Sequence, residues 1–144
     1  MKRLLILSFA LLLGLTFASA QESRGIRFES GSLSEILAKA KKENKLVFMD
    51  VYASWCGPCK IMATQVFTQK KVGDYFNKTF VNAKFDAEKG EGVQIARRYG
   101  VEAYPTFLLL DGNGTLVGKM VGGSPANDFI QKIEGLRQKA LQTE

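Results

Sequence analysis

Apolar positions along the chain follow two different periods. In some stretches they recur every three or four residues, as on the buried face of a helix. In others they run almost without interruption, as in a strand that is covered on both faces. The two kinds of stretch alternate from about residue 33 onward. This alternation predicts a mixed sheet with the element order helix, strand, helix, strand, helix, strand, hairpin strand, helix.

The helical stretches carry signals for where they begin. Ser32 and Glu35 form a capping box, in which each residue can satisfy an unpaired amide of the other. Thr68 is expected to cap a later helix, and Ser124 to cap the last one, with Pro125 at its first helical position. The apolar positions of the predicted helices are Leu33, Ile36, Leu37 and Ala40; Ile61, Met62, Val66 and Phe67; Val72, Tyr75 and Phe76; Val93, Ile95, Ala96 and Tyr99; and Phe129, Ile130, Ile133, Leu136 and Leu141.

The nearly continuous apolar runs are typical of strands. Pro105 stands directly before one of them, a position in which a strand tolerates a residue without an amide hydrogen. The segment Asp111-Gly112-Asn113-Gly114 predicts a hairpin between two antiparallel strands, because these residue types supply the positive φ values of tight turns. The predicted strands are residues 26–28, 46–52, 80–85, 106–110 and 115–121.

Asp50 is the one acidic residue inside the apolar run at 46–52. An ionised carboxylate in a buried strand is costly unless it is paired or neutralised, and such groups often have a raised pKa and a functional role. Two interpretations of Asp50 are open. Either it lies at a sheet end and binds nearby backbone, or it takes up and releases protons in a reaction. The cysteines that follow favour the second interpretation, because a resolving cysteine needs a base.

The two cysteines of the chain, Cys56 and Cys59, stand between this run and a helical stretch. Gly57 allows a sharp turn, and Pro58 has its φ already set for the first turn of a helix. Cys56 is therefore expected at a helix N-terminus, where unpaired amides and the helix dipole favour a thiolate. Cys59 is one turn further on and within reach of a disulfide bond. The pair predicts a dithiol that can open and close.

Length and composition indicate one globular domain, residues 21–144, because 144 residues of which 46% are hydrophobic can bury one sizeable core. Residues 1–20 combine a positive start, an apolar run and the small-residue end Ala18-Ser19-Ala20, as in a cleaved signal peptide. The alternative, an uncleaved membrane anchor, requires a longer apolar span. We therefore expect a periplasmic or secreted monomer that is not inserted in the membrane after cleavage.

The charge of the chain does not point to nucleic acid. Removal of residues 1–20 takes away Lys2 and Arg3, so the formal net charge falls from +6 by two to +4. The remaining basic residues are scattered and mixed with acidic ones, as on a solvated surface. No nucleic-acid partner is expected.

Trp-Cys-Gly-Pro-Cys-Lys at residues 55–60, with Asp50 upstream and Tyr104-Pro105-Thr106 downstream, resembles the pattern of the thioredoxin family. The resemblance covers the chain from about Leu33 to its end. It implies an α/β fold of three layers, α/β/α, with a central mixed β-sheet. It also implies that Pro105 is a cis-proline beside the dithiol and that Tyr104 pairs through its main chain with a bound polypeptide.

Other site residues follow from the same resemblance. Trp55 matches the tryptophan beside the dithiol, Lys84 the lysine near the buried acid, and Gly122 the glycine that flanks the substrate groove. Two positions depart from the family. Tyr52 stands where cytoplasmic members usually carry Trp, and Tyr104 is bulkier than the Ile or Thr common before the proline. Both departures concern the identity of the partner and leave the chemistry intact.

The resemblance implies thiol-disulfide exchange. The Cys56 thiolate would attack a substrate disulfide, and Cys59, deprotonated with help from Asp50, would release reduced substrate and leave a Cys56–Cys59 disulfide. Family members with Gly-Pro between the cysteines are mostly reductants, whereas oxidants tend to carry a histidine there, and this chain has none. We expect an exported reductase of protein disulfides, fed by an upstream thiol donor and using no metal and no cofactor besides the dithiol.

Four other interpretations remain open at this point. The first is a thiol oxidase or isomerase of the same fold. The second, a purely structural disulfide, would close too small a loop to restrain the unfolded chain. The third is a Cu(I) carrier, since two cysteines without histidine cannot hold tetrahedral zinc, and haem attachment needs a histidine where Lys60 stands. The fourth is a domain that binds partners at Pro105 without turnover.

Overall fold

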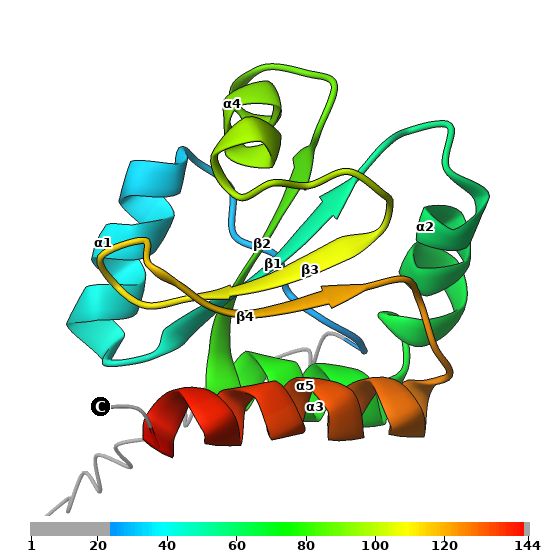
Figure 1. Ribbon diagram of the computed structural model, residues 1–144. Coiled ribbons are helices and arrows are strands. Elements are labelled where there is room, and N and C mark those ends of the chain that lie inside the picture. The colour runs from blue at the N-terminus through cyan, green and yellow to red at the C-terminus, as the bar shows by residue number, and fades with distance from the viewer. Residues whose placement is uncertain (1–23, 143–144) are drawn as a thin grey trace, which may run out of the picture.

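A mixed sheet of four strands forms the middle of the molecule (Figure 1). The computed structural model describes residues 24–142, so the expected signal peptide at residues 1–20 lies outside the described residues. The order across the sheet is β2-β1-β3-β4; β1 and β2 are parallel, and the other two pairs are antiparallel. The strands are β1 (Leu46–Tyr52), β2 (Phe80–Asp86), β3 (Thr106–Leu110) and β4 (Leu116–Val121). The predicted mixed sheet and hairpin are confirmed.

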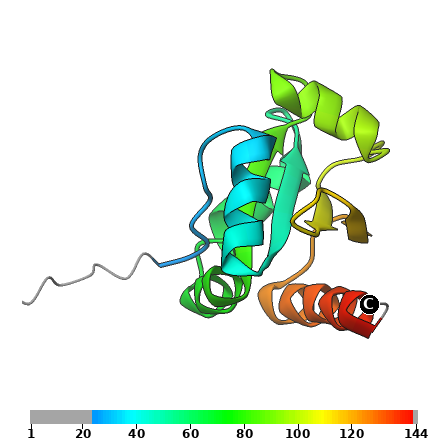
Figure 2. The ribbon, with the colours of Figure 1, turned by 90° about the vertical axis from the view of Figure 1, so that its left-hand side faces the viewer.

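Helices cover both faces of this sheet, as Figures 1 and 2 show. On one face lie α1 (Leu33–Glu43) and α4 (Glu91–Arg98). On the other lie α2 (Gly57–Ile61), the π-helical turn η1 (Met62–Val66), α3 (Lys70–Thr79) and α5 (Ala126–Gln142). The predicted three-layer α/β/α arrangement is confirmed.

Strand β1 supplies both halves of the core, because successive side chains of a strand point to opposite faces. Met49 packs on the side of α1 and α4, whereas Phe48 packs on the other side, among aromatic rings. The Phe76 and Phe129 rings stack at 5.3 Å, and the Phe107 ring meets Phe129 edge to face at 4.9 Å. Each such ring pair stabilises the fold by about 0.5–1.5 kcal/mol beyond the area that it buries.

The capping box of α1 is confirmed in both directions. The Glu35 amide donates to Ser32 Oγ at 3.3 Å, and the Ser32 amide donates to Glu35 Oε2 at 2.8 Å. These two bonds satisfy amides that have no partner inside the helix. The helix ends at Asn44, which has a left-handed backbone with φ 52°.

Residues 26–28 do not form the expected strand. They belong to the segment of residues 24–29, which we call the lead-in, and the amides of Ile26 and Arg27 bind groups outside the sheet. The Ile26 amide donates to the Phe67 carbonyl at 2.8 Å, and the Arg27 amide donates to Asn77 Oδ1 at 2.8 Å. Only at its end does the lead-in meet the sheet, where the Glu29 amide donates to the Asn82 carbonyl on the outer strand β2 at 2.8 Å, and this single bond does not make residues 26–28 a strand.

Two predicted helix caps are also wrong. The helix after Thr68 begins at Lys70, and the Thr68 hydroxyl donates back to the Thr64 carbonyl at 2.9 Å. The last helix begins at Ala126, so Pro125 occupies the cap position and its carbonyl accepts from the Phe129 amide at 2.8 Å. Ser124 therefore lies one residue too early, and its buried Oγ has no hydrogen-bond partner among the described residues.

Candidate active site

The two cysteines form a disulfide at the start of α2, with their Cα atoms 5.3 Å apart. Cys56 is the N-cap residue of the helix, and its Sγ accepts a hydrogen bond from the Cys59 amide at 3.3 Å. Both residues are buried, at 3% and 6% exposure. The helix starts with Gly57 and Pro58, as the sequence predicts, although Gly57 is not among the glycines with positive φ. The turn therefore does not use the freedom expected of Gly57.

This geometry favours an anionic sulfur at Cys56 once the disulfide is reduced. An amide N–H directed at Sγ, together with the positive end of the helix dipole, stabilises a thiolate relative to a thiol. The same helix places Cys59 one turn further on, already in bonding position. The arrangement can therefore capture a sulfur through Cys56 and displace it through Cys59.

Asp50 lies in the middle of β1, 5% exposed. Across the sheet it stands opposite Lys84 on β2 and Phe107 on β3. Its Oδ1 has no hydrogen-bond partner among the described residues. Burial raises the pKa of Asp50 to about 7, and the charge of Lys84 offsets part of that rise. A carboxyl with this pKa exchanges protons readily near neutral pH.

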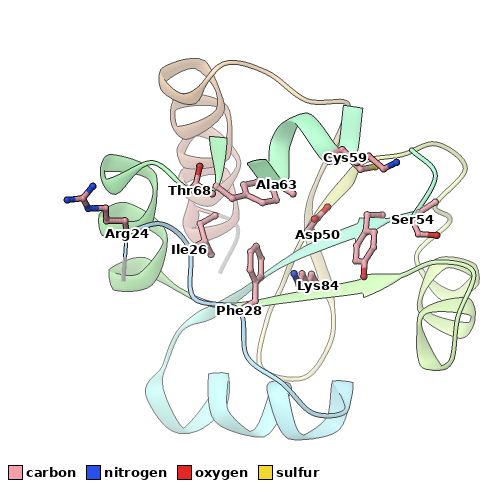
Figure 3. Close-up of a pocket in the computed structure, with 13 residues that line it drawn as sticks. Arg24, Ile26, Phe28, Asp50, Ser54, Cys59, Ala63, Thr68 and Lys84 are labelled. Atoms are coloured by element: carbon pink, nitrogen blue, oxygen red, sulfur yellow. The ribbon is translucent and has the colours of Figure 1, made fainter. Parts of the chain in front are cut away.

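A pocket of about 360 Å³ connects Asp50 with the dithiol (Figure 3). Asp50 and Cys59 both line it, and the lead-in forms another part of its wall through Phe28. The Lys84 ammonium lies 5.3 Å from the centre of the Phe28 ring, whose face attracts the cation, and both residues line the pocket. Asp50, Lys84 and Cys59 are thus brought together as the sequence predicts.

A second group of predicted residues lies around the cis peptide bond between Tyr104 and Pro105, which confirms the expected cis-proline. Tyr104 packs against the buried cluster formed by Ala53, Cys56 and Cys59, so this bond lies alongside the dithiol. The Gly122 amide donates to the Pro105 carbonyl at 2.8 Å, with a φ of 87° that favours glycine.

Trp55 is 67% exposed beside the dithiol and meets the Tyr104 ring edge to face at 5.9 Å. Its indole N–H donates to the Glu88 carboxylate, 3.2 Å from Oε2. Glu88 is not among the site residues predicted from the sequence. A signal for it exists, because Trp55 and Glu88 each follow the carboxyl end of one of two parallel strands, and such ends meet at one edge of a sheet.

No group of three or more His, Cys, Asp or Glu side chains within residues 24–142 could hold a metal ion. No helix in the same range is long and apolar enough to cross a membrane.

Comparison with known proteins gives consistent matches. A family model described as a thioredoxin-like domain matches residues 33–137. Thioredoxin Y of Oryza sativa subsp. japonica, a chloroplastic protein, is 36% identical over 135 residues, which cover 88% of this chain and 74% of that protein.

Among solved structures, a proposed disulphide-isomerase from Bacteroides thetaiotaomicron is similar with a TM-score of 0.72 and 43% identity, covering 81% of this chain and 96% of that one. A thioredoxin from Thermus thermophilus is similar with a TM-score of 0.65 and 29% identity, covering 79% of this chain and 86% of that one.

Proposed function

Since this chain belongs to the thioredoxin-like family and is a thiol-disulfide oxidoreductase, we propose that it works as an exported reductase of protein disulfides. The observation that carries the proposal is the Cys56–Cys59 disulfide at the start of α2, with the Cys59 amide bound to Cys56 Sγ. Cys56 attacks the substrate disulfide as a thiolate, forming a mixed disulfide and releasing one substrate thiolate. Cys59 then attacks Cys56 Sγ, which releases the second substrate thiolate and restores the Cys56–Cys59 disulfide.

Asp50 serves as the base in the second step. Its carboxylate takes the Cys59 proton while Cys59 attacks, and the proton later leaves through the pocket that both residues line. Lys84 stabilises the anionic carboxylate. Trp55, Tyr104, Pro105 and Gly122 hold the substrate chain beside Cys56, and Gly57 and Pro58 support the helix start.

The groups that stabilise the Cys56 thiolate support the reducing direction. A strongly oxidising dithiol owes its potential to a reduced form that is unusually stable. Between the cysteines of this chain stand Gly57 and Pro58, and the chain contains no histidine. The thiolate is therefore stabilised mainly by backbone amides, which leaves the dithiol reducing.

Export is supported by residues 1–20 alone. Their positive start, apolar run and Ala-Ser-Ala end have the form of a signal peptide. In an oxidising compartment the protein needs an upstream thiol donor to regenerate its dithiol. N-terminal sequencing of the protein from cell fractions tests export, and the expected mature chain begins at Gln21 outside the cytoplasm. An intact Met1 in the cytoplasm would contradict it.

The equilibrium of the dithiol with reduced and oxidised glutathione tests the direction. We expect a reduction potential close to that of thioredoxins, about −270 mV, together with reduction of insulin. A potential near −120 mV, as in strong oxidants, would reverse the assigned direction.

The similarity to the proposed disulphide-isomerase from Bacteroides thetaiotaomicron favours isomerisation as a second candidate. An isomerase releases its substrate by attack of a substrate thiol, so it turns over without net oxidation of the dithiol. Refolding of a protein with scrambled disulfides separates the two. A reductase consumes one equivalent of donor thiol pair per bond, whereas an isomerase restores native pairing with little consumption.

A further inference from the structure

The lead-in lies on the face of the sheet that carries Asp50 and Lys84. Phe28 of the lead-in packs against the same apolar cluster as Phe48, whose side chain leaves β1 on the same face as that of Asp50. Lys84 stands opposite Asp50 on β2, so its side chain leaves the sheet on this face too. Phe28, Asp50 and Lys84 consequently line one pocket (Figure 3).

The Lys84 ammonium is turned toward the Phe28 ring (Figure 3). It lies 5.3 Å from the centre of the ring, within the distance at which an aromatic face attracts a cation. It does not donate to Asp50 Oδ1, which has no hydrogen-bond partner within residues 24–142, although Asp50 and Lys84 are direct neighbours across the sheet. The ammonium thus lies by the ring and leaves this carboxyl oxygen without a hydrogen bond.

Phe28 is held in place by hydrogen bonds on both sides of it along the chain. The Ile26 amide donates to the Phe67 carbonyl at 2.8 Å. The Glu29 amide donates to the Asn82 carbonyl, also at 2.8 Å. The Phe28 ring itself meets the Phe67 ring edge to face, with 5.6 Å between the ring centres. A ring that is fixed in this way offers a cation a preformed face, since little further conformational freedom is lost on contact.

The position of the Lys84 ammonium bears directly on the proton of Asp50. Burial raises the pKa of Asp50 to about 7, and the Lys84 charge offsets part of this rise. The other charged or titratable residues that line the pocket are Arg24 on the lead-in, Tyr52 on β1, and Cys59 and Lys60 on α2.

These residues do not replace Lys84. Figure 3 shows Arg24 directed away from Asp50, and Cys59 is held in the disulfide. Phe107, which faces Asp50 from β3, carries no charge. A displacement of the Lys84 ammonium therefore changes the electrostatic environment of the carboxyl.

We propose that Phe28 is a positioning residue, whose ring holds the Lys84 ammonium away from Asp50 and so sets how tightly Asp50 binds its proton. From the ring, the cation stabilises the carboxylate less than it would from hydrogen-bond distance, because Coulomb attraction weakens with separation. The buried acid therefore titrates near neutral pH, where a base exchanges protons most effectively. The inference rests on the proposed function, in which Asp50 is the base for Cys59.

Phe28→Leu tests the positioning, because leucine keeps an apolar side chain at this site and removes the aromatic face. The pKa of Asp50 is measured from the NMR chemical shift of its carboxyl carbon in the disulfide form, in which the cysteines do not titrate. We expect Phe28→Leu to lower this pKa by about 0.5–1 pH unit, because the released Lys84 ammonium approaches the carboxylate. Phe28→Tyr retains an aromatic face and should retain the wild-type pKa. An unchanged pKa in Phe28→Leu would overturn the proposal.

The same measurement in Lys84→Met protein separates positioning from simple cover. Leucine is smaller than phenylalanine, so Phe28→Leu can also admit water to the pocket, and solvation by itself lowers the pKa of a buried carboxyl. Once Lys84→Met has removed the ammonium, positioning predicts that Phe28→Leu causes no further change in the pKa of Asp50. A fall as large as in the protein that retains Lys84 would assign Phe28 a purely structural role and overturn the proposal.

Stopped-flow kinetics extend the test to the reaction. Reduced protein is mixed with excess dithiobis(2-nitrobenzoate). Attack by Cys56 releases one thionitrobenzoate, and attack by Cys59 on Cys56 Sγ releases the second. This second phase does not depend on reagent concentration and is absent in Cys59→Ser. Its pH midpoint belongs to Asp50 and Cys59 as a coupled pair, and we expect it to fall in Phe28→Leu together with the pKa of Asp50.

The two measurements keep the inference and the proposed function apart. A lowered pKa of Asp50 in Phe28→Leu with an unmoved kinetic midpoint would support the positioning by Phe28 and reject Asp50 as the base. A protein that releases no second thionitrobenzoate would fail the proposed dithiol chemistry, whereas the NMR titration would still decide the role of Phe28.

Discussion

Asp50 on β1 stands directly opposite Lys84 on β2, yet its buried Oδ1 has no hydrogen-bond partner among the described residues. Burial disfavours the charged carboxylate, and the nearby cation compensates only in part, so the pKa of Asp50 rises to about 7. The folded protein consequently holds the Asp50 proton more tightly than the unfolded chain does. Both the stability and the chemistry of the site should depend on this proton.

Replacement of Asp50 by Asn is expected to stabilise the protein at pH 8 and change little at pH 4. Wild-type stability should fall as pH rises from about 4, where the unfolded carboxyl ionises, to about 7, and then level off. The gain at pH 8 should be about 2–4 kcal/mol in urea unfolding of the disulfide form. Asp74→Asn, on the exposed face of α3, serves as control. Equal stability of Asp50→Asn and wild type at pH 8 would contradict the raised pKa.

Cys59→Ser should trap substrates as mixed disulfides at Cys56. Without the second sulfur, the captured bond can be released only by an external thiol. Non-reducing electrophoresis and mass spectrometry of the variant after incubation with a disulfide-bonded protein should show an adduct that dithiothreitol removes. The Cys56→Ser variant should form far less of it. A partner that stays bound in dithiothreitol would indicate a non-redox binding domain.

Ser32 caps α1, whereas Ser124 does not cap α5, so the two residues should differ in their contribution to stability. Ser32→Ala should lower the free energy of unfolding by about 1 kcal/mol, because the Glu35 amide loses its acceptor. Ser124→Ala should change it by less than about 0.5 kcal/mol, or raise it, because the buried Ser124 hydroxyl has no hydrogen-bond partner within residues 24–142 to lose. Urea unfolding of both variants measures the difference. A larger loss at Ser124 would show that this residue caps α5 after all.

Glu134 on α5 should stabilise the fold in a pH-dependent way. Hydrogen bonds from Arg137, at 2.8 and 2.9 Å, are the main cause that lowers the pKa of Glu134 to about 2, and the Tyr75 hydroxyl also donates to it. Its contribution is therefore present above the ordinary carboxyl pKa and lost as pH falls from about 4 to about 2.

Glu134→Gln should accordingly cost about 1 kcal/mol at pH 7, a value that allows for partial solvent screening, and almost nothing near pH 2. Thermal unfolding at both pH values measures this. Glu102→Gln, at an exposed carboxylate before β3, controls for the change in net charge. A loss of equal size at pH 2 and pH 7 would speak against the ion pair.

Replacement by Ala should destabilise the protein at Gly92 and be tolerated at Gly57. A Cβ atom at Gly92 would lie 1.8 Å from the Asp86 carbonyl oxygen, so α4 must move away from the end of β2. We expect a loss of about 3 kcal/mol or more, because overpacking against backbone is poorly relieved. A Cβ atom at Gly57 meets nothing within 4 Å, and Gly57→Ala should remain within about 0.5 kcal/mol of wild type in urea unfolding. A tolerated Gly92→Ala would contradict the close approach of α4.

Much of the fold is determined by local pattern. The capping box at Ser32 and the hairpin at residues 111–114 depend on neighbours within a few positions, and both form as predicted. The same holds for Cys56 at a helix start, because Pro58 sets the first turn regardless of what packs around it. The apolar runs likewise identify β1 and β3, since burial on both faces leaves no polar alternation in these strands, whereas the half-exposed β4 is identified by the hairpin turn before it.

Prediction from the local sequence fails where residues far away in the chain determine the local structure. The lead-in contains strand-forming residues, yet Asn77 on α3 and the Phe67 carbonyl take the amide hydrogens of Arg27 and Ile26, so these residues do not pair as a strand. Ser124 is a residue type that favours the N-cap, but α5 begins at Ala126, so Pro125 occupies that position instead.

The sequence alone thus determined the order of the elements, the dithiol at a helix start and the family that the motif resembles. Tertiary structure decided the rest of the site: the burial that raises the pKa of Asp50, the contact of Trp55 with Glu88, and the approach of Lys84 to the Phe28 ring. The reason is physical. Helix and turn signals act over a few residues, whereas burial, charge and concave surfaces arise only when segments far apart in the chain are packed together.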